Sequence, residues 1–125
     1  TMIEKALDIL FKHKLYGDVA HTCHNYSVSG GKSYYYCGVA FYKRKKYKTS
    51  IKWFEKAWKR GIRTSGLCLY LGKSFEAVNE LKAAEKILLF GRSRNPRNIN
   101  LKRALVNIYR KQKKFEKAHK MMKEL

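Results

Sequence analysis

The sequence repeats its pattern of residue types every 34 residues. Gly38, Gly72 and Val106 mark corresponding positions, and the residues around them keep the same register. The other matching columns are Cys37, Leu71 and Leu105, then Phe41, Phe75 and Tyr109, then Tyr47, Leu81 and Phe115, then Ser50, Ala84 and Ala118, and last Phe54, Leu88 and Met122. A fixed period of this length is typical of a repeat protein, in which each unit stacks on its neighbour and buries one continuous core.

Each unit shows helical periodicity twice. The packing positions follow the spacing i, i+3, i+4, i+7 in both halves; in one unit they are Tyr34, Cys37, Gly38 and Phe41, then Tyr47, Ser50, Ile51, Phe54 and Ala57. Each unit is therefore predicted to be two antiparallel helices joined by a short basic turn. Small residues recur near the middle of both halves, because two helices approach closely only where the facing side chain is small.

With these residues the chain resembles the tetratricopeptide repeat family, whose unit has a W/Y-x-x-L-G-x-x-Y first helix, an A-x-x-x-F-x-x-A second helix and a closing Pro. The matching residues are Tyr34, Cys37, Gly38, Phe41, Ser50, Phe54 and Ala57, then Cys68, Leu71, Gly72, Phe75, Ala84, Leu88 and Pro96, then Leu105, Val106, Tyr109, Ala118 and Met122. The departures are Ser50, Ile62, Gly91 and Val106. The resemblance implies a right-handed solenoid of antiparallel helix pairs, with a concave groove lined by the first helix of each unit.

The expected fold is thus all-α, one domain over residues 1–125 with about eight helices. Hairpins are expected near residues 2–27, 32–60, 65–91 and 98–124, and the first is a degenerate unit that aligns with the second at an offset of 31. The helices are expected near 2–13, 16–27, 32–45, 48–60, 65–77, 80–91, 98–111 and 115–124. Thr1 precedes Met2, which suits a piece of a longer protein from which a targeting segment has been removed, or a residue added in front.

The chain has 29 Lys and Arg against 9 Asp and Glu, a net charge of +20. Such an excess indicates an anionic partner: an acidic protein segment, a nucleic acid or a lipid surface. The alternatives are solubility alone, or an excess that an acidic part of a longer protein offsets. No apolar run approaches the roughly 18–20 residues that span a bilayer.

Cys23, Cys37 and Cys68 are odd in number and widely spaced, so no disulfide framework is expected. The predicted location is the cytoplasm or another reducing compartment. His21 and His24 flank Cys23, but a zinc site needs about four ligands and the sequence has no second pair. We therefore expect no metal and no cofactor.

The stretch Gly30-Gly31-Lys32-Ser33 raises the question of a phosphate-binding loop. Such a loop needs G-x-x-x-x-G-K-[ST] after a buried strand, and Tyr26 stands where the first glycine belongs. The preceding residues read as a helix. Gly30 and Gly31 are expected to end that helix, and Ser33 to help start the next one.

The acidic residues are scattered and form no pair suited to acid–base catalysis, so the chain is predicted not to be an enzyme. They are Glu4, Asp8, Asp18, Glu55, Glu76, Glu80, Glu85, Glu116 and Glu124. Those on second helices lie among basic neighbours, where pairing at i, i+4 is the default.

The groove positions that the resemblance implies run from aromatic to basic. The predicted partner-binding residues are Tyr35, Tyr36, Tyr42, Tyr70, Lys73, Arg103, Asn107 and Arg110, with Val39, Leu69 and Glu76 among them. Tyr offers contact area and Arg binds carboxylate or phosphate with two hydrogen bonds. The alternative for the tyrosines is packing against the preceding hairpin. Some members bind C-terminal carboxylates through a Lys and Asn clamp, which is absent here because Tyr35 and Val39 stand in those places.

A second basic feature lies on the connections between units. Stacking is expected to place these residues side by side as a ridge, formed by Lys59, Arg60, Arg63, Arg92, Arg94 and Arg97. The ridge and the groove tyrosines support the alternative function, non-specific binding of RNA or DNA. Further lysines on the turns spread the charge over several surfaces, which disfavours sequence-specific readout.

The leading interpretation is a non-catalytic scaffold for protein–protein interaction that binds an acidic or aromatic-acidic segment of a partner in a larger assembly, with no small-molecule substrate. At the C-terminal end, Phe115, Ala118 and Met122 are expected to face their partner helix. Met121 and Leu125 are expected to stay uncovered. Because the charge opposes contact between copies, the chain alone is expected to be a monomer.

Overall fold

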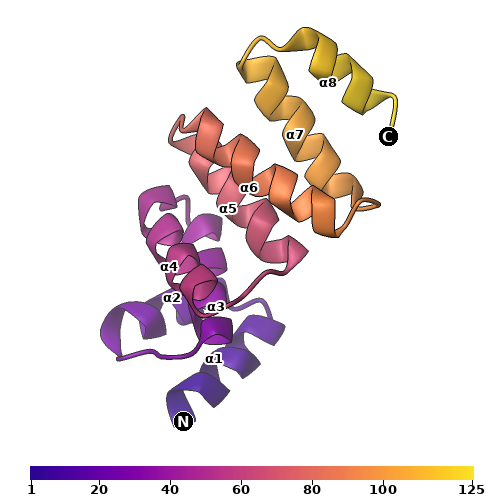
Figure 1. The fold of residues 1–125 in the computed structure, drawn as a ribbon. Coiled ribbons are helices and arrows are strands. Elements are labelled where there is room, and N and C mark those ends of the chain that lie inside the picture. Colours follow the sequence, from indigo (N-terminus) through magenta and orange to yellow (C-terminus); the bar gives the residue numbers. More distant parts are fainter. The chain divides into compact units, whose positions relative to one another are not determined.

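The computed structural model describes all 125 residues, which form eight α-helices and no strand (Figure 1). The chain divides into two compact units, Thr1–Ile62 and Arg63–Leu125. The first contains α1 (Met2–Lys12), α2 (Tyr16–Asn25), α3 (Gly31–Lys43) and α4 (Tyr47–Lys59); the second contains α5 (Ser65–Ala77), α6 (Leu81–Arg94), α7 (Ile99–Lys111) and α8 (Phe115–Met122). Each helix begins and ends within three residues of the expected position, so the all-α prediction is confirmed.

The turn inside each hairpin is the same structure four times. Lys14, Lys45, Asn79 and Lys113 all have left-handed φ angles between 58° and 62°. In each turn the next N–H donates to a carbonyl five residues back, as Lys46 N does to Phe41 O at 2.9 Å. This is a Schellman ending, which reverses the chain directly into the second helix. The last three turns repeat at the 34-residue period, and the first precedes the second by 31 residues, as the alignment predicted.

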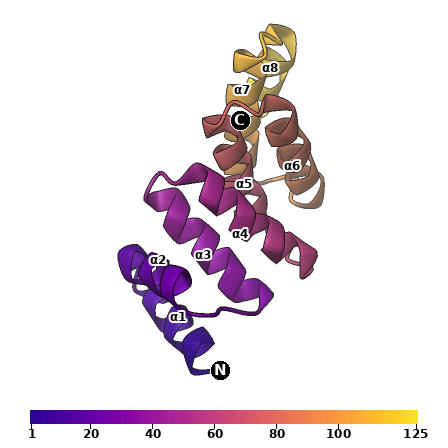
Figure 2. The same ribbon diagram turned by 90° about the vertical axis from the view of Figure 1, so that its left-hand side faces the viewer.

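Glycines allow the two helices of a hairpin to touch. A Cβ on Gly72 would lie 2.6 Å from Leu88 Cγ, and a Cβ on Gly38 would meet the ring of Phe54. Gly91, on α6, faces Cys68 on α5, where an added Cβ would lie 2.7 Å from the cysteine Cβ. Figure 2 shows the close antiparallel pairing of α3 and α4 that such contacts permit.

Each unit has its own buried core. In the first unit the core includes Leu7, Val19, Cys23, Cys37 and Phe41. In the second unit it includes Cys68, Ala84, Leu88, Leu101, Leu105, Ile108 and Tyr109. Leu7 takes the place that Gly38 holds one unit later, which shows how the degenerate hairpin fills the same interface with a larger side chain.

Cys23 on α2 and Cys37 on α3 form a disulfide, with their Cα atoms 5.9 Å apart. The expectation that the cysteines stay unpaired is wrong for these two, and only Cys68 is free. The sequence did not predict this disulfide, because its formation depends on how α2 packs against α3. The reducing compartment stays a prediction, without the support that unpaired cysteines would have given it.

Two local expectations are corrected. Gly30 and Gly31 do not end a helix: α2 ends at Asn25, Gly30 is the N-cap of α3 with φ 100°, and Ser33 lies inside α3. On α8 the buried residues are Ala118 and Met121, whereas Phe115 and Met122 are 64% and 42% exposed. The short helix is therefore rotated from the expected position, so that Met121 rather than Met122 meets the core.

None of the eight helices has the length and apolar character needed to cross a membrane.

Candidate partner-binding surfaces

The basic end of the predicted groove lies on one face of α7. Arg103, Asn107 and Arg110 follow the spacing i, i+4, i+7 and are all exposed. The opposite face of the helix is buried through Leu101, Leu105 and Ile108. Because these two sets alternate along a single helix, core packing itself turns the three polar side chains toward solvent. The Arg110 guanidinium donates to Met122 Sδ at 3.3 Å, which holds its side chain toward α8.

An ion pair joins the first helices of the second unit. Lys111 Nζ on α7 lies 2.9 Å from Glu76 Oε2 on α5. Glu76 is one of the groove positions that the sequence analysis identified, and the pair occupies it with a lysine of the same chain. On α5, Tyr70 and Lys73 are half-buried.

The aromatic end lies in the first unit. Tyr36 is 5% exposed and stacks on Phe11 of α1, with ring centroids 4.2 Å apart. Tyr35 packs at 6.0 Å from Phe11, and Tyr42 contacts Tyr47 edge-on at 5.6 Å. Tyr36 therefore packs against the preceding hairpin, as the alternative reading of the tyrosines held, while Tyr35 and Tyr42 keep half-exposed surfaces.

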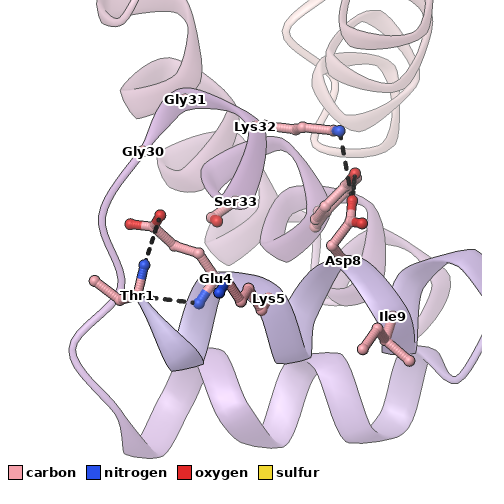
Figure 3. Close-up of a pocket in the computed structure, with 10 residues that line it drawn as sticks. Thr1, Glu4, Lys5, Asp8, Ile9, Gly30, Gly31, Lys32 and Ser33 are labelled. Carbon is pink, nitrogen blue, oxygen red and sulfur yellow. Dashed lines mark hydrogen bonds and ion pairs between the residues drawn. The ribbon is translucent and has the colours of Figure 1, made fainter.

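A cavity of about 570 Å³ opens between α1 and the beginning of α3 (Figure 3). Its lining combines both charges with the Gly-Gly-Lys-Ser stretch: Thr1, Glu4, Lys5, Asp8, Ile9, Gly30, Gly31, Lys32, Ser33 and Tyr36. Lys32 Nζ reaches from α3 to Asp8 Oδ1 on α1 at 3.4 Å. Ser29 Oγ donates to Glu4 Oε1 at 3.0 Å and so ties the connection before α3 to α1.

Asp8 and Tyr36 have pKa values far from neutrality. The Tyr36 hydroxyl donates to Asp8 Oδ1 at 2.6 Å, and this hydrogen bond, with the one from Lys12, lowers the pKa of Asp8 to about 2. Burial, followed by the same hydrogen bond, raises the pKa of Tyr36 to about 12. A general acid or base works best with a pKa near the operating pH. These groups therefore hold two helices together and are unsuited to exchanging protons with a substrate at neutral pH.

Asp8, Lys32 and the cavity they share were not among the predicted site residues. The i, i+4 spacing of Asp8 and Lys12 indicated only a local pair, which the structure has at 2.9 Å. The offset of 31 would have placed Asp8 beside Val39, a groove position, and so could have identified it.

The predicted ridge residues fall in both units. Lys59 and Arg60 belong to the first, and the Arg60 guanidinium lies 5.7 Å from the centroid of the Tyr34 ring. Arg63, Arg92, Arg94 and Arg97 belong to the second. A single ridge that runs through all six residues stays a prediction, as does a single groove.

Within the second unit the ridge arginines have different neighbours. Burial raises the pKa of the Cys68 thiol, while the charges of Arg63 and Arg94 oppose that shift, so both arginines lie near this cysteine. Arg92 lies 3.4 Å from Glu124. Arg94 and Arg97 line a small cavity of about 460 Å³ in the connection between α6 and α7.

No cluster of three or more His, Cys, Asp or Glu side chains is suited to hold a metal ion. Cys23 is bonded to Cys37, and His21 and His24 beside it are exposed on α2. The H-x-C-H stretch therefore offers no thiolate ligand.

No protein-family model matches the sequence, and no curated protein matches it. Solved structures match its fold. A structure described as MamA MSR-1 C2 has a TM-score of 0.82 at 17% identity, over 97% of this chain and 71% of that one. YrrB, described as a TPR protein with an unusual peptide-binding site, has a TM-score of 0.83 at 14% identity, over 97% of this chain and 64% of that one.

A third similar structure is the Hsp90 co-chaperone Cns1 from Saccharomyces cerevisiae, with a TM-score of 0.71 at 18% identity. That match covers 98% of this chain and 42% of Cns1, so the chain spans less than half of that protein and less than two thirds of YrrB. The structural agreement with each of these three structures extends over nearly the whole chain. The fold of this protein is the tetratricopeptide-repeat fold.

Proposed function

We propose that this protein is a non-catalytic scaffold that binds an acidic or aromatic-acidic segment of a partner protein through residues of its first helices. The observation that carries the proposal is the exposed row of Arg103, Asn107 and Arg110 on α7. The two arginines lie on the same face of α7, about two helical turns apart, and each can bind a carboxylate with two hydrogen bonds. An amide between them adds a donor and an acceptor for a peptide backbone.

Charge stoichiometry supports an acidic partner. Nine acidic residues cannot neutralise 29 basic ones, so most basic side chains lack an internal counterion whatever the packing. In the second unit three of the five acids are already engaged: Glu76 with Lys111, Glu85 with Lys114, and Glu124 with Arg92. Arg103 has no such partner and is open to an incoming carboxylate.

The aromatic component rests on the half-exposed tyrosines Tyr35, Tyr42 and Tyr70. A tyrosine loses little conformational entropy on binding and offers both an apolar ring and a polar hydroxyl. YrrB, one of the similar structures, is described as having a peptide-binding site, which supports peptide recognition as a use of this fold. The absence of a catalytic step is part of the proposal, because Asp8 and Tyr36 are held far from a proton-transferring pKa.

The test is selection from a random peptide library on the full chain, followed by affinity measurement. Selected peptides should be enriched in acidic and aromatic residues. The double substitution Arg103→Glu and Arg110→Glu should weaken the best peptide by at least about tenfold, because reversed charges repel it. The matched control is Lys82→Glu with Lys86→Glu, the same charge change on exposed positions of α6.

Circular dichroism should show unchanged helicity in both double variants. Equal loss of affinity in the two variants would contradict the α7 site and leave only a general charge effect. Selected peptides without acidic enrichment would contradict the proposed partner chemistry.

A further inference from the structure

The solvent face of α4 carries an unbroken row of lysines. Lys48, Lys52, Lys56 and Lys59 follow the spacing i, i+4, i+8, i+11 and are all exposed. At 1.5 Å per residue the row is about 16 Å long. The opposite face of α4 holds Ser50, Phe54 and Ala57 in the core, so packing turns every lysine of the row outward.

The repeat itself does not require this row. One repeat later, the corresponding positions on α6 hold Lys82, Lys86, Phe90 and Ser93. Two repeats later, the first two positions hold Glu116 and Lys120 on α8, and the third holds Glu124 just after that helix ends. Because all three helices have the same place in their hairpins, the fold tolerates other residues at these positions. The complete row on α4 is a property of this helix alone.

Like charges four residues apart on a helix destabilise it by a few tenths of a kcal/mol for each pair. Two neighbouring pairs of the row are four residues apart and the third is three apart. The one nearby acid, Glu55, forms no ion pair with these lysines, so the repulsion is not compensated within the helix. Lys48, Lys52 and Lys59 form no ion pair with any acid of the chain. A binding partner that supplies regularly spaced negative charge would remove this repulsion.

Aromatic rings flank the row. The Lys56 ammonium lies 4.7 Å from the ring centroid of Trp53 and 5.7 Å from that of Tyr34. The two rings are 5.8 Å apart, and Arg60 lies over Tyr34 at 5.7 Å. A phosphate that draws Lys56 toward the row would uncover a ring face on which a base can stack.

We propose that the α4 face binds single-stranded nucleic acid without sequence preference, with the lysines on successive phosphates and the Tyr34–Trp53 pair beside the bases. Evenly repeated point charges suit a row of ammonium groups, whereas carboxylate recognition favours the fork of arginine. A lipid surface is disfavoured because α4 has no large apolar side chain that is fully exposed for insertion: Phe54 is buried in the core, and Trp53 is partly buried beside Tyr34. This surface shares no residue with the α7 row, and the inference does not depend on the proposed function.

The test uses a fluorescently labelled single-stranded RNA of about 12 nucleotides and the full chain. Each phosphate neutralised on a single strand contributes about 0.7 to the slope of log affinity against log salt. Four lysines therefore predict about a 50-fold loss of affinity between about 50 and 200 mM salt. Lys48→Ala with Lys52→Ala should reduce that loss to about 7-fold and weaken binding at low salt.

The matched control is Lys82→Ala with Lys86→Ala, the corresponding positions one repeat later, which should leave the slope unchanged. Glu55→Gln should tighten binding, a gain that damage to the fold would not produce. In a Trp58→Phe background, RNA should quench the fluorescence of the remaining Trp53.

Absence of binding at about 50 mM salt would overturn the proposal, since electrostatic contacts are little screened there. Equal effects of the α4 and α6 substitutions would also overturn it. A third outcome would overturn it as well: an acidic peptide, or vesicles with an anionic lipid, binds more tightly than the RNA, and this binding is lost when Lys48 and Lys52 are substituted. The α4 face would then bind a different partner.

Discussion

Gly72 and Leu88 are in direct contact across the α5–α6 hairpin, and a Cβ on Gly72 would lie 2.6 Å from Leu88 Cγ. Leu88 is 1% exposed, so other side chains surround it. The two residues stand in matching columns of the repeat, where Gly38 and Phe54 make the same contact one unit earlier. The distance shows why the first helix of these units has a glycine at this position.

Gly72→Ala is therefore expected to destabilise the protein by roughly 1–3 kcal/mol through overpacking. This sign is opposite to the gain of up to about 1 kcal/mol that the same change gives at an open helix position. Gly17→Ala on α2 is the control, because its Cβ would meet only the end of Arg44 at 3.4 Å, and it should stabilise. Urea unfolding of both variants measures the difference, and a stabilising Gly72→Ala would contradict the contact.

The Cys23–Cys37 disulfide closes a loop with a sequence separation of 14. Reduction, or the double substitution Cys23→Ala and Cys37→Ala, should lower the free energy of unfolding by roughly 3 kcal/mol, because the unfolded chain regains its freedom. The double variant should no longer respond to reductant. Thiol titration of the denatured, unreduced protein should find Cys68 alone, and three reactive thiols would show the disulfide to be absent in solution.

Asp8 makes stability depend on acid pH. Its pKa is about 2 in the folded protein against an ordinary 3.8, so the unfolded chain binds more protons between these values. Its stabilising contribution is complete above about pH 4 and is lost as the pH falls toward 2. Asp8→Asn should flatten this acid limb in an unfolding series. Tyr36→Phe removes the largest cause of the shift and should bring the pKa of Asp8 closer to its ordinary value.

Lys45 occupies the left-handed turn between α3 and α4, a conformation that costs a side chain roughly 1 kcal/mol. Lys45→Gly should stabilise the protein by about 0.5–1 kcal/mol, because glycine adopts this φ without the Cβ clash. Lys46→Gly removes the same charge from the following residue, where φ is −98°, and should not increase stability. Thermal unfolding of the pair separates backbone relief from charge removal, and equal shifts would mean that charge alone is responsible.

The sequence alone was sufficient for the helices, because their determinants are local. The spacing of apolar residues and the recurrence of small residues at Gly38 and Gly72 depend only on a helix pairing with its neighbour in sequence. The turn between α1 and α2 was likewise predictable, because Tyr16 aligns with Tyr47 at the offset of 31 residues that separates the first hairpin from the second. Arg103, Asn107 and Arg110, which the sequence assigned to the predicted groove, are exposed on one face of α7, and their part in binding stays a prediction.

Tertiary packing decided what joins one hairpin to the next. The Cys23–Cys37 bond and the contact of Asp8 with Tyr36 depend on the angle at which one hairpin meets the following one. Helical periodicity does not encode that angle, because the angle depends on contacts between side chains that are distant in sequence. Cys23 and Cys37 are 14 residues apart, and Asp8 and Tyr36 are 28 residues apart. The rotation of α8, which buries Met121 and exposes Met122, has the same origin: a helix of 8 residues is oriented by the few side chains it can fit against α7.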